Sequence, residues 1–141
     1  MKSGLFRELF KNNEIKPYSI GDSFPFISSN NSQKLQLAII ASLTCSTCIE
    51  LLNNISELNK YTFPIYLFLA GTDQEVSGFE KQSSLHIEKT TPISDNMIST
   101  DFRAKGTPFI YILDRELKVL DSGIVDEIKD IDEILLKHLH A

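Results

Sequence analysis

Residues 37–58 read LAIIASLTCSTCIELLNNISEL, and this stretch decides how the rest of the chain can be arranged. The apolar run at 37–41 has the length and β-branched content of a buried strand. After the second cysteine, apolar residues recur at a spacing that favours a helix, namely Ile49, Leu51, Leu52, Ile55 and Leu58. Cys45 and Cys48 are therefore predicted to lie where a strand passes into a helix.

This position determines what the two cysteines can do. The first turn of a helix has unpaired backbone N–H groups and a positive dipole end, which favour a thiolate over a thiol at Cys45. A thiolate is the nucleophile in disulfide exchange. Cys48, three residues on, is close enough to attack the resulting mixed disulfide. The spacing predicts thiol–disulfide exchange, with Cys45 attacking and Cys48 resolving.

Length and charge restrict the class of protein. A chain of 141 residues fits one domain with a core of its own, which needs no disulfide to hold it together. The net charge is −5 and the basic residues are scattered, so nucleic acid is not expected as a partner.

The opening residues and the apolar runs predict a cytoplasmic protein. Residues 1–13 are interrupted by Arg7, Glu8 and Lys11, unlike the apolar core of a secretory signal. The apolar runs at 37–41 and 65–70 are too short to cross a bilayer. In a reducing compartment a C-x-x-C pair is expected to be catalytic or metal-binding rather than a structural disulfide.

The N-terminal residues form a predicted extension. Residues 3–11 have the pattern of a short amphipathic helix, expected to pack on the domain's own sheet, with a membrane or partner contact as the alternative. Residues 20–27 predict a turn and a short extended piece, in which Pro25 favours an edge position.

The remaining chain alternates strands and helices. Strands are predicted at 63–70, 109–113 and 117–121, with a short one at 85–87, and helices at 74–83, 94–102 and 126–140. Thr72 and Ser94 are the expected caps of the first two helices. Strands joined through helices pair in parallel, whereas the hairpin after residue 109 adds antiparallel strands. The expected fold is α/β, a central mixed sheet with helices on both faces.

Two motifs in this order resemble the thioredoxin superfamily: CSTC at 45–48 and GTP at 106–108. GDSFPF at 21–26, GTPFIYILD at 106–114 and KVL at 118–120 are most similar to the bacterial redoxin branch with TlpA- and ResA-type thiol–disulfide oxidoreductases. The resemblance implies one thioredoxin-like domain over residues 20–141, preceded by the extension at 1–19. It also includes, in size and motif, small proteins of bacteriocin clusters of the sporulation-killing-factor type, which implies maturation of a secreted antimicrobial peptide.

The resemblance also implies roles for individual residues. Pro108 would be cis, and Thr107 would offer backbone groups to an extended peptide or protein substrate. No cofactor and no metal is implied, but a redox partner protein is. The chain departs from the family where Thr44 replaces an aromatic residue and Ile39 replaces the buried acid. A further departure places Leu51 at the position of the ResA-type glutamate, which leaves open what accepts the proton of Cys48.

Other interpretations of the cysteines are a pair of buried apolar residues, a zinc or copper site, a thiol peroxidase, and a peptide-binding module without catalysis. A zinc site needs further ligands, but His86, His138 and His140 all lie far from the motif in sequence. No proline precedes either cysteine in the peroxidase pattern Pro-x-x-x-Thr-x-x-Cys. The histidines are expected at a strand edge and a solvated helix end, and Arg103 and Lys105 are expected to be solvated or to steer an acidic substrate.

Overall fold

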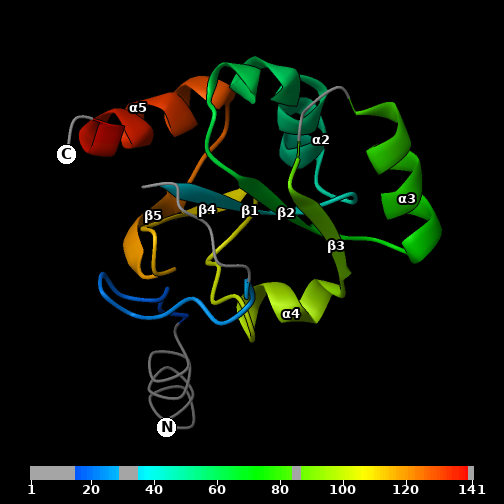
Figure 1. Ribbon diagram of the computed structural model, residues 1–141. Helices are drawn as coiled ribbons and strands as arrows, with labels where there is room; N and C mark the ends of the chain where they lie inside the picture. The colour runs from blue at the N-terminus through cyan, green and yellow to red at the C-terminus, as the bar shows by residue number, and fades with distance from the viewer. Residues whose placement is uncertain (1–14, 29–34, 84–86, 140–141) are drawn as a thin grey trace, which may run out of the picture.

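A mixed five-stranded sheet forms the centre of the computed structural model, which describes residues 15–28, 35–83 and 87–139 (Figure 1). The strand order is β3-β2-β1-β4-β5, with β1 in the middle. β1 pairs in parallel with β2 and antiparallel with β4, while β2–β3 is parallel and β4–β5 antiparallel. The strands are β1 (Gln36–Ser42), β2 (Ile65–Ala70), β3 (Lys89–Ile93), β4 (Phe109–Leu113) and β5 (Val119–Ile124).

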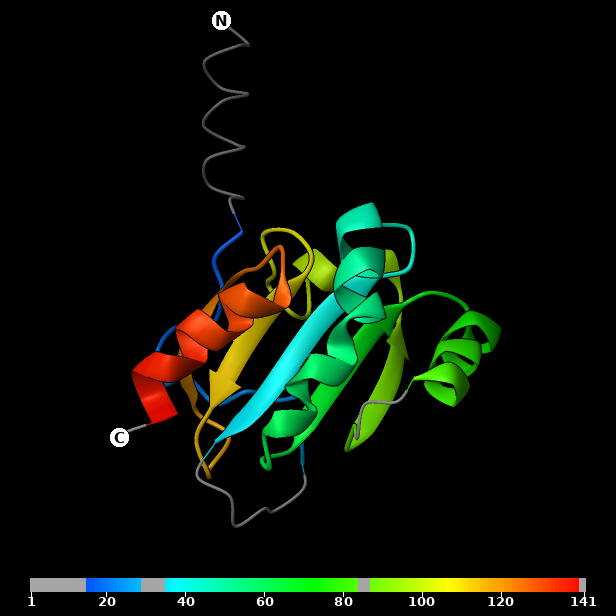
Figure 2. The same ribbon diagram turned by 90° about the horizontal axis from the view of Figure 1, so that it is seen from above.

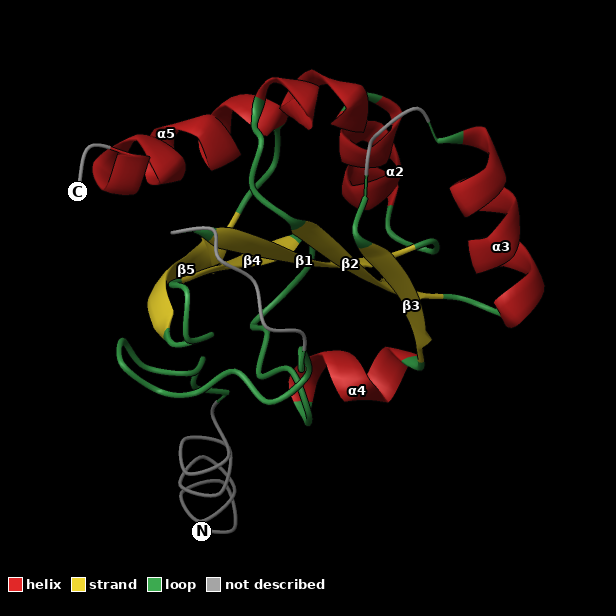
Figure 3. Cartoon of the chain, in the orientation of Figure 1, coloured by secondary structure: helices red, strands yellow, loops and turns green. Residues whose placement is uncertain are grey.

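Helices lie on both sides of this sheet (Figures 1 and 3). One side carries α2, η1 and α5, while α4 and the N-terminal segment 15–28 cover the other, and α3 lies beyond the β3 edge. The helices are α2 (Ser46–Asn53), the 3₁₀ helix η1 (Ile55–Lys60), α3 (Asp73–Gln82), α4 (Asp95–Ser99) and α5 (Ile128–Leu139). The predicted α/β arrangement is confirmed, and among the described residues no helix has the length and apolar character to span a membrane.

The two faces of the sheet are packed with different kinds of side chain. The aliphatic face lies under α2, η1 and α5, as seen from above in Figure 2, and it also buries Cys48. Its principal residues are Leu37, Ile39, Leu51, Leu52, Leu58, Leu67, Leu69, Ile110, Ile112, Ile131 and Leu135. The opposite, aromatic face is built largely of rings, and these include Phe24, Phe68, Phe102, Phe109 and Tyr111. Alternation along each strand sends successive side chains to opposite faces.

The segment 15–28 is held on the aromatic face by ring contacts and by one pairing with the sheet. Phe24 packs against five rings, with centroid distances from 5.3 to 6.3 Å. Tyr18 lies edge-on to Tyr111 at 5.8 Å. Ser23 forms an isolated antiparallel bridge with Lys118, so the predicted edge position of this piece is confirmed. The predicted helix at 3–11 lies outside the described residues.

Most predicted elements are present, and their ends differ for local reasons. The helix predicted to continue to Leu58 ends at Asn53, and the chain resumes as η1. The strand predicted from residue 63 begins at Ile65. Thr72 caps α3 in a capping box with Glu75, as the cap prediction required.

One strand of the sheet was not predicted from the sequence. This strand is β3 at Lys89–Ile93. Of the short strand expected at 85–87, residues 85 and 86 lie outside the described part of the chain, and Ile87 belongs to no strand. The sequence of β3, KTTPI, lacks an apolar run because β3 is an edge strand in which only Thr90 and Ile93 are buried. Pro92 also makes the segment look unlike a strand, although proline is tolerated at an edge.

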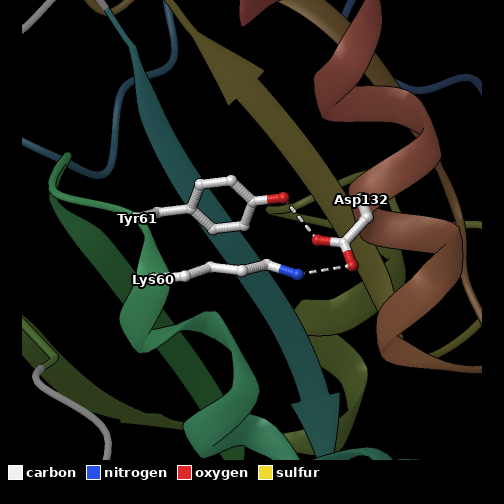
Figure 4. Close-up of polar contacts among 3 residues, drawn as sticks. All are labelled: Lys60, Tyr61 and Asp132. Atoms are coloured by element: carbon white, nitrogen blue, oxygen red, sulfur yellow. Dashed lines mark hydrogen bonds and ion pairs between the residues drawn. The ribbon is translucent and has the colours of Figure 1, made fainter.

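A polar contact joins η1 to α5 on the side of the sheet that carries α2, η1 and α5. The Tyr61 hydroxyl donates to Asp132 Oδ1, and Lys60 Nζ lies 2.9 Å from Asp132 Oδ2 (Figure 4). Burial of the Tyr61 hydroxyl, followed by its bond to the carboxylate, raises the pKa of Tyr61 above its ordinary value. Asp132 thus fixes the end of η1 against the middle of α5.

Candidate active site

Cys45 occupies the N-cap position of α2, so its side chain faces the unpaired N–H groups of the first turn. Its backbone is extended, with φ −103° and ψ 119°, and its carbonyl accepts the first helical hydrogen bond from Ile49 N–H at 3.0 Å. The sulfur replaces the side-chain oxygen of a usual N-cap residue, since Cys45 Sγ accepts a hydrogen bond from Cys48 N–H at 3.2 Å. The predicted position at the strand-to-helix junction is confirmed.

This geometry favours ionisation of Cys45. Burial of the thiol opposes it, but hydrogen bonds from the side chain and backbone of Cys48 and from the side chain of Thr107 outweigh the burial and hold the pKa of Cys45 below the usual 9.0. The residue is partly exposed, so the sulfur is not sealed in the core. Cys45 therefore has the two properties that a nucleophilic thiol needs, thiolate character and access.

Cys48 has the opposite character. It is fully buried on the aliphatic face, and both cysteines are free thiols. Burial, and then the hydrogen bond with Cys45, raise the pKa of Cys48 to about 11. The pair therefore consists of one partly exposed sulfur that ionises more readily than an ordinary thiol and one buried sulfur that keeps its proton at neutral pH.

The sheet brings Thr107 and Pro108 to the cysteines. β4 runs antiparallel to β1 with Phe109 opposite Ile40, so the residues just before β4 lie beside the loop that follows β1. The Thr107–Pro108 peptide bond is cis, as predicted. The Cys45 thiol donates to the Thr107 carbonyl oxygen at 3.7 Å, which joins two motifs 62 residues apart. Pro108 is itself held by the residue that follows β5, since its carbonyl accepts from Val125 N–H at 3.0 Å.

A group of polar side chains below the turn before Cys45 was not predicted. Ser42, the last residue of β1, donates to Asp95 Oδ1 at 3.3 Å and lies 2.9 Å from Thr44 Oγ1. From the sequence, Asp95 was expected only to cap a helical turn together with Ser94. No sequence signal could have found this contact, because residues 42 and 95 meet only through the packing of α4 against β1.

Other residues singled out in the sequence lie elsewhere. Ile39 is fully buried where thioredoxins carry an acid, and Leu51 is buried at the position of the ResA-type glutamate. His138 is not a solvated helix end but pairs with Asp121 at 3.0 Å, and His86 and His140 lie outside the described residues. The Arg103 guanidinium lies over the Tyr18 ring at 4.4 Å, which is a contact neither of the two expectations included.

The described residues contain no group of three or more histidine, cysteine or carboxylate side chains arranged to hold a metal ion. The two sulfurs have Thr107 beside them and no imidazole or carboxylate hydrogen bond. The arrangement can carry out sulfur chemistry with the chain's own groups.

Comparisons with known proteins identify the fold. No protein-family model matches the chain, and no curated protein matches it. Among solved structures, the protein assigned as thiol:disulfide interchange protein DsbE from Chlorobium tepidum matches with a TM-score of 0.66 and 14% identity, covering 87% of this chain and 97% of that one. A thiol-disulfide isomerase from Corynebacterium glutamicum matches with a TM-score of 0.62 and 12% identity, covering 92% and 97%. A thioredoxin-like protein from Parabacteroides distasonis gives a TM-score of 0.62 at 11% identity, covering 86% and 96%. The predicted thioredoxin-like fold is confirmed.

Proposed function

We propose that this chain, with its thioredoxin-like fold, is a thiol–disulfide oxidoreductase that exchanges disulfides with a peptide or protein substrate. The observation that carries the proposal is the contrast within the cysteine pair. Cys45 is partly exposed and has a lowered pKa, while Cys48 lies one helical turn behind it, buried and protonated. Disulfide exchange needs one thiol ready to attack and a second held in reserve.

The exchange uses only the two sulfurs and the substrate's disulfide. The Cys45 thiolate attacks one substrate sulfur, the substrate S–S bond breaks, and the departing substrate sulfur leaves as a thiolate that takes up a proton. Cys48 then loses its proton and attacks Cys45 Sγ, which forms the Cys45–Cys48 disulfide and releases the second substrate thiol. Two electrons have passed from the protein to the substrate, and the reverse sequence oxidises a substrate dithiol.

Thr107 is the proposed backbone contact for the substrate. In the reduced thiol form its carbonyl accepts from Cys45 at 3.7 Å. A thiolate has no hydrogen to donate, so ionisation of Cys45 frees this carbonyl for an N–H of an extended substrate. The cis Pro108 has no N–H of its own, which leaves Thr107 as the strand-like edge next to the nucleophile.

The test is exchange with a disulfide-bonded model peptide, followed by thiol alkylation in glutathione redox buffers. Wild type should reduce the peptide and form an internal disulfide, whereas Cys45→Ser should be inactive. Cys48→Ser should accumulate a mixed disulfide through Cys45, because the resolving sulfur is gone. Ser46→Ala, a change at an exposed position between the cysteines, is the matched control and should remain active.

Two outcomes would count against the proposal. Inertness of Cys45 toward alkylating agents at pH 7 would remove the nucleophile. Retention of peptide binding, with no exchange in wild type, would favour the binding-module alternative, in which the double cysteine-to-serine variant still binds.

The finer parts of the proposal rest on the sequence resemblance. We propose maturation of a secreted antimicrobial peptide as the role, a cytoplasmic location, and a dithiol partner protein that restores the cysteine pair after each cycle. Recovery of a disulfide-linked peptide on the Cys48→Ser variant in cells would test the role. Cell fractionation tests the location.

A further inference from the structure

The turn that carries Cys45 is held from below by hydrogen bonds to the Ser42 side chain. β1 ends at Ser42, and the chain reaches Cys45 through Leu43 and Thr44. Thr44 N–H donates to Ser42 Oγ at 3.2 Å, and the Thr44 hydroxyl lies 2.9 Å from the same oxygen. Cys45 N–H donates to the Ser42 carbonyl at 3.2 Å. Both residues before the nucleophile's helix are thus tied to Ser42.

Ser42 is in turn fixed by a residue from another element. It is only 4% exposed, and its hydroxyl donates to Asp95 Oδ1 at 3.3 Å. Asp95 is the first residue of α4, on the opposite side of the sheet from α2. In the described part of the chain, the Ser42 side chain bonds to Thr44 of its own turn and to Asp95, which belongs to another element.

The direction of these hydrogen bonds follows from the atoms. A carboxylate can only accept, so the single hydroxyl hydrogen of Ser42 goes to Asp95. Ser42 Oγ then has only lone pairs to offer, and the Thr44 hydroxyl must donate to it. Asp95 therefore orients the Ser42 oxygen as the acceptor for both Thr44 donors, the N–H and the O–H.

We propose that Asp95 is a positioning residue for Cys45, acting through Ser42 and Thr44 to hold the turn that places the Cys45 sulfur on the first N–H groups of α2. The inference rests on the proposed function, for which it names a further residue. Among the described residues, Asp95 makes no hydrogen bond to the Cys45 sulfur or to Thr107, so its effect is indirect.

An electrostatic role and a positioning role of Asp95 predict opposite shifts in the ionisation of Cys45, which makes the inference testable. Removing a negative charge near a thiol favours the thiolate, so a purely electrostatic Asp95 would make Cys45 ionise more readily when it is replaced. Loss of the hydrogen bond instead loosens the turn and weakens the bond from Cys48 N–H to the Cys45 sulfur, which disfavours the thiolate. Only positioning predicts a shift of Cys45 ionisation toward higher pH.

The experiment measures the rate of Cys45 alkylation by iodoacetamide from pH 5 to 10, in the full chain with Cys48→Ser so that one thiol reports. Cys48, removed here, is the titratable side chain that acts on Cys45. We expect Ser42→Ala and Asp95→Ala each to lower the rate at pH 7 about threefold and to move the profile to higher pH. Asp95→Asn keeps an acceptor oxygen for Ser42 and should restore the rate.

Asp101→Ala is the matched control, because it removes an exposed carboxylate two residues beyond the C-terminal end of α4. An unchanged profile in Ser42→Ala, a shift toward lower pH in Asp95→Ala, or an equal shift in Asp101→Ala would each overturn the inference. If Asp95→Ala unfolds α4, Ser42→Ala still decides, since it leaves α4 untouched. Alkylation needs no substrate, so failure of peptide exchange in wild type would contradict the proposed function while leaving this measurement informative.

Discussion

The aliphatic and the aromatic face of the sheet both support the cysteine pair, but they are covered by different kinds of structure. The aliphatic face is covered by regular helices, whose branched side chains recur with the helical period and bury Cys48. The aromatic face is covered by α4, which has five residues, and by loops held through ring contacts and single hydrogen bonds. It supports the segment from Phe102 to Pro108 that brings Thr107 to Cys45.

The two sides of the sheet control different parts of the candidate site. The regular side sets how deeply the Cys48 sulfur is buried, and the irregular side sets where Thr107, the proposed substrate contact, lies. Mutations on the two faces should therefore differ in kind, and the following predictions run from the largest expected effect to the smallest.

Phe24→Ala should be the most damaging change on the aromatic face. Phe24 is 2% exposed and touches five other rings, so its removal loses apolar burial and leaves a cavity among rigid neighbours. We expect the free energy of unfolding in urea to fall by about 3–5 kcal/mol. Phe24→Leu should recover much of the loss, and a cost of less than about 1 kcal/mol for Phe24→Ala would mean that segment 15–28 adds little to the core.

The elements on the aliphatic side were the easiest to predict from the sequence. Its residues belong to long periodic runs, and α5 was predicted from the stripe that includes Ile128, Ile131 and Leu135. The aromatic side was harder because its covering segments have no period. Phe24 and Phe26 stand in an irregular stretch, and nothing local shows that they meet Phe102.

The candidate site divides in the same way. Cys45, Cys48, Thr107 and Pro108 were named from short motifs, and the structure brings the two motifs together. The contact between Ser42 and Asp95 could not be predicted, since it depends on how α4 docks on β1. Local pattern therefore predicted the reacting atoms, while the supporting contacts required the tertiary structure.

Tyr111→Phe should show how far the aromatic face depends on one hydroxyl. Tyr111 is fully buried, donates to the Phe102 carbonyl at 2.7 Å and accepts from Tyr18 N–H at 3.2 Å. Removing the oxygen leaves both backbone groups without this partner, so we expect a loss of about 1–3 kcal/mol by urea unfolding. Tyr66→Phe on β2 is a comparison at another buried tyrosine.

If Tyr111→Phe is as stable as wild type, the loop from Phe102 to Pro108 is held by ring packing alone. The aromatic face would then differ from the aliphatic one only in the shape of its side chains.

The stability of the folded protein should fall in alkaline solution because of Cys48, which is buried on the aliphatic face. Its folded-state pKa of about 11 lies above the ordinary 9.0, so the folded protein keeps a proton that the unfolded chain releases. The stability this provides is fully present below pH 9 and is lost as the pH rises from 9 to 11, by about 2 kcal/mol at most.

The measurement is urea unfolding of the reduced protein at pH 8 and pH 10.5, with a phosphine reductant present. Cys48→Ala should show a smaller loss between the two pH values than wild type, because the other titrating groups are common to both proteins. Equal losses would show that Cys48 titrates normally and is less protected than its burial indicates.

Tyr61→Phe tests the polar contact outside the aliphatic face and should have the smallest effect. The phenol joins η1 to α5 through Asp132, but this contact lies near solvent, with the Asp132 side chain 25% exposed (Figure 4). Water can replace the lost partner, so we expect a cost of about 1 kcal/mol. Lys60→Met should cost less still, because its ion pair is exposed and such pairs add little.

A double-mutant cycle with Asp132→Asn separates the two contacts: the coupling energy of Asp132 to Tyr61 should exceed its coupling energy to Lys60. The reverse order would mean that the charge of Lys60, rather than the phenol of Tyr61, holds η1 against α5.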